Sequence, residues 1–434
     1  MSSIMCGAGP ETRLAALLPE RRTDRQGVVL SGPGRGPSEA ARQRRTTRPA
    51  TPFSLVVVAH PDRLPTNHAS PAPAPLLGPP ARPGRSRGNA WGLYRREDDD
   101  NHPGDVDDAL GALNMLTPAV VAAAASAEIR TGVRVSLDWP LTKPSAPSFG
   151  RTGLQHTLHS RLRTTDPGTD QRVVNDDTLQ FNTQCSSQWD GFRHYGYQQA
   201  KRFYNNTSQE TIESSNTLGI DAWVAHGGIV GRGVLLDYAG YAARHGIALD
   251  HFASAGIPVD HIQAVVREQG VAFQPGDIVL LRIGFTAAYD ALTPAQQAAL
   301  PQRAVPGFLG LAPTRGMLQW LWETNCAAVA SDAVGLEQVP IFGDHVRQRQ
   351  PGGAAGGEGG GHWHGEPWEQ EMQGGGLLHQ WVLAGWGVPI GEMFDLEALR
   401  AQCVQQKRWT FFFASVPLRV PGGVASPPNA IAIF

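Results

Sequence analysis

The sequence predicts an α/β fold, and three observations support this class. An unbroken apolar run, "GDIVLLRIGF" at 276–285, is typical of a strand that is buried on both faces. "GVLLDYAGYAARHG" at 233–246 indicates a buried strand that continues directly into a helix. "RWTFFFASVPL" at 408–418 and "AIAIF" at 430–434 predict two closing strands. Strands and helices therefore interleave, with more strand than in a plain doubly wound sheet.

The first hundred residues differ from the rest in composition. They contain 14 of the 34 prolines and 15 arginines but no lysine. A stretch of this kind buries too little apolar surface to offset the entropy that ordering costs. We therefore expect residues 1–104 to be a disordered extension, with "FSLVVVAH" at 53–60 as one stray strand, and residues 105–434 to form the folded domain.

The remaining elements of this domain follow from periodicity and from helix and strand breakers. Proline at 118 and glycine at 132 bound one of the helices, and Pro140 ends one of the strands. A run with 11 glycines at 350–376 predicts a flexible insertion, in which His362 and His364 are weak metal candidates. We expect helices at 105–116, 118–132, 293–303 and 307–324, and strands at 133–141 and 326–334.

Composition limits the possible functions. The chain has 434 residues, 41% of them apolar and 18% charged, with a net charge of −2. This balance favours a globular protein and gives no electrostatic reason to expect nucleic acid or an anionic membrane as a partner. No apolar run reaches the roughly 18 residues that a membrane span needs. The four cysteines form no C-x-x-C pair, which favours a reducing compartment, so we expect a cytoplasmic protein.

One short stretch carries most of the chemical signal, "QCSSQWDGFRH" at 184–194. Asp190 offers a hard oxygen ligand, and His194 binds a metal or moves a proton near neutral pH. Trp189, Phe192 and Tyr195 surround this pair, as aromatic walls surround the polar groups of a small-molecule pocket. Taken alone, such a pair is more often a hydrogen-bonded structural contact than a functional site.

A second polar cluster lies far downstream, in "LHQWVLAGWGVPIGEMFDL" at 378–396. His379 and Glu392 bracket a predicted change from helix to strand, and Gly385 and Gly387 mark the break. A histidine and a carboxylate that meet another aspartate and histidine in space are typical of a hydrolytic metal site.

These stretches resemble the cyclase-like metal-dependent hydrolases, a family that includes kynurenine formamidase and isatin hydrolase. The resemblance covers roughly residues 130–434 outside the insertion and is strongest for the fungal branch. It rests on "LDWPLTKPSAPSFGR", "VNDDTLQFNTQCSSQWDGFRHYGY", "GIDAWVAHGGIVGRGVLLDYA", "GDIVLLRIGF", "LAGWGVPIGEMFDL" and "SVPLRVPGGVASPPNAIA". It implies a swivelling β/β/α domain with a mixed β-sheet core, and a homo-oligomer.

The resemblance also implies roles for individual residues. Well-studied members carry H-x-G-T-H-x-D-x-x-x-H, in which the aspartate matches Asp190 and the last histidine, a proton shuttle, matches His194. The two ligand histidines fall on Gln184 and Gln188, where this chain departs from the pattern. The metal ligands implied are Asp190, Gln184, Gln188, His379 and Glu392. Arg282, at the end of the strand at 276–285, is implied as a pocket residue.

The function implied is hydrolysis of a small amide, formamide or lactone by metal-activated water, with His194 as general base. N-formylkynurenine, an intermediate in the conversion of tryptophan to kynurenine, is the model substrate. The oxygen-rich ligand set suits manganese or magnesium better than zinc, with one or two ions bound, or none. Two alternatives stay open: a metal-free lyase or cyclase that uses His194 and Asp190, and a non-catalytic binding module on the same fold.

Overall fold

The computed structural model describes residues 89–94, 108–163, 172–198, 200–303, 307–339 and 377–434. Residues 1–88 and 95–104 of the expected extension, with the strand at 53–60, and the glycine-rich insertion with His362 and His364 lie outside these ranges. Residues 89–94 of the extension are described and pack against the domain: Ala90 is buried, its amide donates to the Gly385 carbonyl, and the Trp91 indole donates to the Ala384 carbonyl. The division into an extension and a domain from residue 105 therefore stays a prediction.

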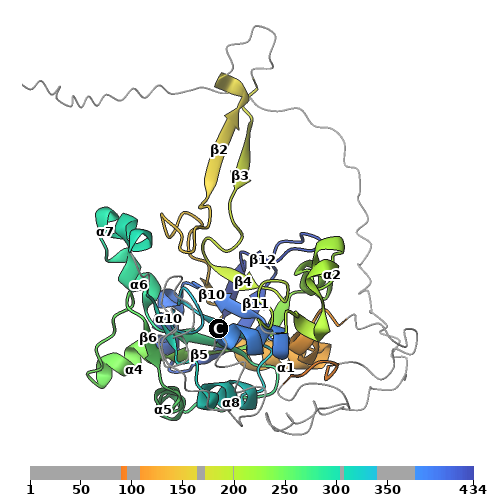
Figure 1. Cartoon of the computed structure of the whole chain (residues 1–434). Coiled ribbons are helices and arrows are strands. Elements are labelled where there is room, and N and C mark those ends of the chain that lie inside the picture. The colour runs from red at the N-terminus through yellow and green to blue at the C-terminus, as the bar shows by residue number, and fades with distance from the viewer. Residues whose placement is uncertain (1–88, 95–107, 164–171, 199, 304–306, 340–376) are drawn as a thin grey trace, which may run out of the picture. The chain divides into compact units, whose positions relative to one another are not determined.

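Nine strands of the described residues form one mixed sheet, which confirms the α/β class with a mixed sheet core (Figure 1). The four central strands run parallel, and antiparallel strands flank them on both sides. In spatial order the strands are β1 (Arg134–Ser136), β13 (Ala430–Ile433), β11 (Thr410–Ser415), β5 (Ile229–Asp237), β7 (Ile278–Arg282), β9 (Ala328–Ser331), β10 (Ile390–Glu392), β4 (Gln188–Asp190) and β12 (Ala425–Ser426).

The central strands are the core of the molecule. Leu235 on β5 and Leu280 on β7 are fully buried, as the unbroken apolar runs predicted. Because β5, β7, β9 and β10 are parallel, their carboxyl ends meet at one edge of the sheet. This edge is where ligands bind in open α/β sheets, and Glu392 lies at the end of β10.

Helices connect the strands, and several begin at the side-chain caps that the sequence contains. The Thr117 side chain accepts a hydrogen bond from Val120 N at the start of α1, and Asp237 caps α4 in the same way at Gly240 N. The α-helices are α1 (Pro118–Glu128), α2 (Gln209–Ser214), α3 (Asp221–Ala225), α4 (Tyr238–Arg244), α5 (Val259–Gln269), α6 (Phe285–Asp290), α7 (Pro294–Ala299), α8 (Arg315–Glu323) and α10 (Glu397–Gln406). Short helical turns lie at Gly111–Met115, Arg161–Arg163, Tyr204–Asn206 and Leu300–Gln302, and a π-helix spans Gln380–Gly385.

The structure corrects three of the expected elements. Of the helix expected at 105–116, the described residues form only a 3₁₀ turn at Gly111–Met115, because Gly111 has a φ of +54° and its amide donates to the Asp108 carboxylate. The helix at 307–324 begins only at Arg315, because β8 (Leu309–Leu311) pairs with β6 (Ala255–Ile257). The strand expected at 133–141 shortens to β1.

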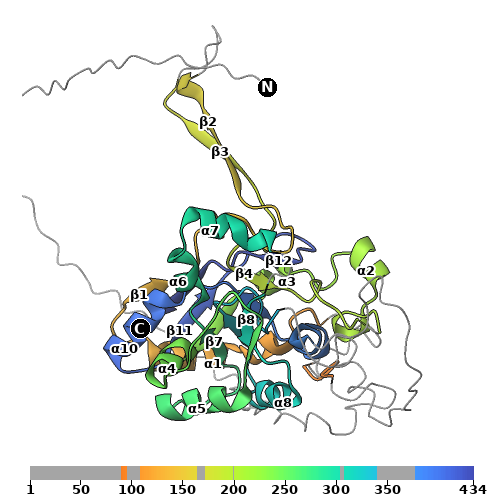
Figure 2. The same cartoon turned by 60° about the vertical axis from the view of Figure 1, so that its left-hand side comes forward.

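Two further elements stand apart from the main sheet. β2 (Gln155–Ser160) and β3 (Asn175–Gln180) form an antiparallel hairpin that projects from the rest of the domain, and nearly all of its side chains are exposed (Figures 1 and 2). Among the described residues, no helix combines the length and apolar character that crossing a bilayer requires.

Candidate active site

Strand β4 places the first polar cluster on one face of the sheet. It lies between β10 and β12, with Ile390 opposite Asp190 and Glu392 opposite Gln188. Successive side chains of a strand point to opposite faces, so Gln188 and Asp190 share one face and Trp189 points to the other. The cross-strand register therefore brings Gln188 beside Glu392, although the two residues lie 204 positions apart.

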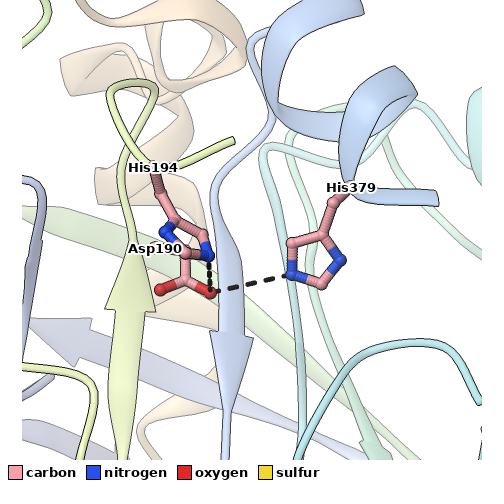
Figure 3. A group of neighbouring side chains, drawn as sticks. All are labelled: Asp190, His194 and His379. Atoms are coloured by element: carbon pink, nitrogen blue, oxygen red, sulfur yellow. Dashed lines mark ion pairs between the residues drawn. The ribbon is translucent and has the colours of Figure 1, made fainter. Parts of the chain in front are cut away.

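Two histidines complete the cluster around Asp190 (Figure 3). His194 lies in the turn after β4, held by the bond from its backbone amide to the Gly191 carbonyl. His379 occupies the N-cap position of the π-helix, although its side chain makes no capping hydrogen bond. The Asp190 Oδ2 atom lies 3.9 Å from His194 Nε2 and 3.8 Å from His379 Nε2. One ligand atom from each of the three residues lies within 4.8 Å of the others, which is the compactness that a metal site requires.

Two glutamates flank His379. Its Nε2 atom lies 3.1 Å from Glu392 Oε1, and its Nδ1 atom lies 2.8 Å from Glu337 Oε2. Glu337 is fully buried and was missed in the sequence. The one hint in the sequence is that a carboxylate interrupts the apolar run after β9. A carboxylate on Nδ1 fixes the ring orientation and leaves Nε2 facing the cluster, as in carboxylate–histidine–metal arrangements.

The two glutamines at the usual histidine positions also contact the cluster. The Gln184 amide nitrogen lies 2.7 Å from Asp190 Oδ1 and 3.2 Å from each ring nitrogen of His194. The Gln188 amide donates to Asp190 at 3.1 Å and to Glu392 at 2.8 Å, so it bridges the two carboxylates. The Gln188 carbonyl oxygen is buried and has no partner among the described residues.

Burial and neighbouring charges shift the pKa of each group differently. Burial raises the pKa of Glu392 to about 7, and the Asp190 carboxylate adds to this rise. Burial also acts to raise the pKa of Asp190, but the charges of His194 and His379 outweigh it and bring it to about 2. Burial lowers the pKa of His194. In His379 the contacts with Glu337, Asp190 and Glu392 outweigh burial and raise the pKa. His194 therefore favours its neutral form, and His379 favours its charged form and has to lose the proton on Nε2 when it binds an ion.

These residues fit a divalent cation. The buried Gln188 oxygen without a partner and the raised pKa of the Glu392 carboxyl both indicate a cluster that lacks positive charge. Asp190, Glu392 and His379 are the residues that would hold the ion, with His194 beside them.

The three aromatic residues expected to line the pocket divide between core and site. Trp189 is fully buried, packs edge-on against Phe394 and donates from its indole to Ser415. Phe192 is also fully buried, among other aromatic rings. Both rings therefore lie in the core, Trp189 because it follows the alternation of β4 to the opposite face and Phe192 because it packs against Tyr204 and Trp223 after the end of that strand. Tyr195 is half-buried, and its ring centroid lies 5.8 Å from that of His379.

Arg282, which was expected as a pocket residue, forms ion pairs outside the cluster around Asp190. It lies at the carboxyl end of β7 and pairs with Asp237 at 2.7 Å and with Glu397 at 2.8 Å. Asp237 and most of Arg282 are buried, and Arg400 also reaches Asp237, at 3.3 Å. These contacts describe a structural ion-pair network that joins β5, β7 and α10.

Comparisons with known proteins agree with this architecture. The family described as "Putative cyclase" matches residues 116–338. A crystal structure of a novel cyclase matches with 27% identity and a TM-score of 0.60, over 80% of this chain and 99% of that one. Isatin hydrolase A from Labrenzia aggregata matches with 16% identity and a TM-score of 0.44, over 72% and 97%.

Isatin hydrolase A from Ralstonia solanacearum gives similar values, 16% identity and a TM-score of 0.43, over 73% of this chain and 97% of that one. No curated protein matches the chain. Placement in a fungal branch stays a prediction. Because the family match spans more than half of the chain, this chain belongs to the family described as "Putative cyclase".

Proposed function

We propose that this protein is a metal-dependent hydrolase of a small amide, formamide or lactone, with N-formylkynurenine as the model substrate. One observation carries the proposal: the structure brings Asp190, His194 and His379 to within 4.8 Å of one another. Glu392 lies at the edge of the same cluster, 3.1 Å from His379. Carboxylates and imidazoles in this arrangement are typical of hydrolytic metal sites.

The chemistry that a divalent ion supplies in such a site is activation of water and polarisation of a carbonyl. On the protein side, the Glu337 carboxylate orients His379. The backbone register of β4 and β10 sets the Asp190 and Glu392 carboxylates on the same face. The ligands therefore come from rigid elements, which preorganises them for the ion.

His194 is the residue best suited to move the proton. Its side chain is 20% exposed, whereas Asp190 is completely buried, so His194 is the member of this pair open to a substrate. The lowered pKa keeps the imidazole neutral near pH 7. A neutral imidazole accepts a proton from the attacking water and returns it to the leaving nitrogen or oxygen. Tyr195, whose ring centroid lies 6.1 Å from that of His194, offers an aromatic surface beside it.

Turnover assays with and without a chelator test this proposal. The purified protein is treated with EDTA, reloaded with manganese, magnesium or zinc, and assayed on N-formylkynurenine and simple lactones. We expect hydrolysis that EDTA abolishes and metal restores, and loss of activity in His194→Ala. His226→Ala, which removes an exposed histidine outside the cluster, serves as the matched control. Metal that binds without turnover of any compound in the panel would count against the proposal.

A metal-free lyase or cyclase is the second candidate, and one observation favours it. The Gln188 amide already bridges the Asp190 and Glu392 carboxylates, so the cluster has a donor between its two acids without an ion. Activity that is unchanged by EDTA but lost in His194→Ala would support this candidate. A protein that binds ligands without turning any over would be the binding module.

Several expectations remain proposals of the same kind. They are the tryptophan-to-kynurenine pathway, a cytoplasmic location and a homo-oligomer. The mass of the protein in solution, measured by light scattering, tests the oligomer directly.

A further inference from the structure

A half-buried arginine, Arg151, lies next to the candidate active site without a carboxylate partner. Its Nη1 atom donates to the Gln184 carbonyl oxygen at 3.0 Å. Its guanidinium lies 5.2 Å from the ring centroid of Phe149, which is 56% exposed. Among the described residues, no acidic side chain forms an ion pair with Arg151, although exposed basic residues elsewhere, such as Lys143, have such partners.

The backbone bond places this charge beside the cluster. Arg151 holds the carbonyl of Gln184, and the side chain of the same Gln184 contacts both Asp190 and His194. The charge of Arg151 also acts on the pKa values of Asp190, His194 and Glu392, lowering each of them, although burial is the largest influence on all three. A positive side chain therefore lies at the cluster and comes from a loop that precedes the β2–β3 hairpin.

The Arg151 guanidinium also has an edge of two donors with which it can bind an anion. The bond to Gln184 uses only Nη1, and no described residue accepts from Nε or Nη2 of Arg151. These two nitrogens form one edge of the fork, the edge that binds a carboxylate with two parallel hydrogen bonds. Electrostatics point the same way. The carboxylates of Asp190, Glu337 and Glu392 contact His379 and disfavour a substrate anion at the cluster itself, whereas the Arg151 charge beside the cluster favours one.

We propose that Arg151 binds a carboxylate on the substrate, so that the preferred substrates are small amides or lactones that carry an anionic group beside the bond to be cleaved. This inference rests on the proposed hydrolase function and names its substrate class. In this arrangement the substrate carboxylate meets the Nε and Nη2 edge while the reacting carbonyl faces His194. The Phe149 ring, 5.2 Å from the guanidinium, adds a cation–π contact to the side chain.

A purely structural role for Arg151 predicts different behaviour. If Arg151 only supports the Gln184 carbonyl, a single donor suffices and Arg151→Lys behaves like the wild type on every substrate. If it binds a carboxylate through two donors, Arg151→Lys loses part of the preference and Arg151→Gln loses nearly all of it. The matched control is Arg134→Gln, because Arg134 is exposed on β1, at the opposite edge of the sheet from β4.

The test compares two formamides that differ only in charge, formanilide and 2-formamidobenzoate, with the metal-loaded full-length protein. We expect the wild type and Arg134→Gln to favour 2-formamidobenzoate. In Arg151→Gln we expect KM for this substrate to rise on the order of 10- to 100-fold, with little change for formanilide. Equal effects of Arg151→Gln on the two substrates, or no preference in the wild type, overturn the inference.

Failure of the hydrolase proposal gives a different result. If the wild type cleaves neither formamide, the proposed function fails, and calorimetric titration with benzoate decides the role of Arg151. Benzoate that binds the wild type at least about tenfold more tightly than Arg151→Gln supports the anion site. Equal affinities overturn it. Thermal unfolding of each variant shows that the loss does not come from misfolding.

Discussion

Replacing Glu337 with glutamine removes one charge from the cluster and keeps the shape of the side chain. In the structure, Glu337 is completely buried, and both of its oxygens lie within 2.9 Å of His379 Nδ1. A hydrogen bond to a charged group contributes about 1.5–3 kcal/mol and one between neutral groups about 0.5–1.5 kcal/mol. The substitution should therefore cost about 1–1.5 kcal/mol in the orientation of His379, which is roughly a tenfold weakening of metal binding.

The measurement is a competition titration of manganese against a fluorescent chelator, on the purified wild type and on Glu337→Gln. Glu268→Gln is the control, since Glu268 is exposed on α5 and pairs with Arg244 and His245 at the end of α4. We expect the control to bind the metal like the wild type. Equal dissociation constants for the wild type and Glu337→Gln, with both proteins folded, would refute the view that Glu337 orients a metal ligand.

Three further predictions follow from the placement of the other residues. The double substitution Gln184→His with Gln188→His should strengthen zinc binding relative to manganese, because zinc prefers nitrogen ligands; no change in a competition titration would mean that these side chains do not face the ion. Trp189→Ala should lower the free energy of unfolding by about 3–5 kcal/mol, because Trp189 fills the core. Urea denaturation measures this free energy, and a loss below about 1 kcal/mol would indicate that Trp189 lines a pocket instead. Arg282→Leu should cost about 3–5 kcal/mol by leaving Asp237 buried without its closest partner, with metal affinity unchanged; a stable variant that binds metal poorly would instead place Arg282 in the site.

The elements predicted correctly are those in which a local pattern and the tertiary structure agree. The apolar run at 276–285 became β7, and the run at 233–246 became the end of β5 followed by α4. The errors arose where a contact far away in sequence decided the local conformation. Gly111 packs against the backbone of Gly387, so that region forms a 3₁₀ turn despite its helical periodicity. Leu309–Leu311 became strand β8 because Ala255–Ile257 offered it a partner.

The candidate site shows the same division. The residues Asp190, His194, His379 and Glu392 came from a motif and its family resemblance, and the structure brings them together. Glu337 lies outside the stretches that carry the resemblance, and Arg151 ends one of them, "LDWPLTKPSAPSFGR", without an implied role, because one glutamate and one arginine look like many others in a sequence. Trp189 and Phe192 are next to Asp190 in sequence but lie in the core, because Trp189 points to the opposite face of β4 and Phe192, after the end of the strand, packs against Tyr204 and Trp223.

The sequence by itself determined the α/β class, the buried central strands and the residue types available for chemistry. These follow from local properties, namely the hydrophobic periodicity of strands and helices and the chemistry of each side chain. The tertiary structure decided which of these residues meet. The pairing of β4 with β10 aligned Gln188 with Glu392, and the start of the π-helix turned His379 toward Asp190. Such contacts depend on strand register and on the packing of distant segments, which the whole chain sets together.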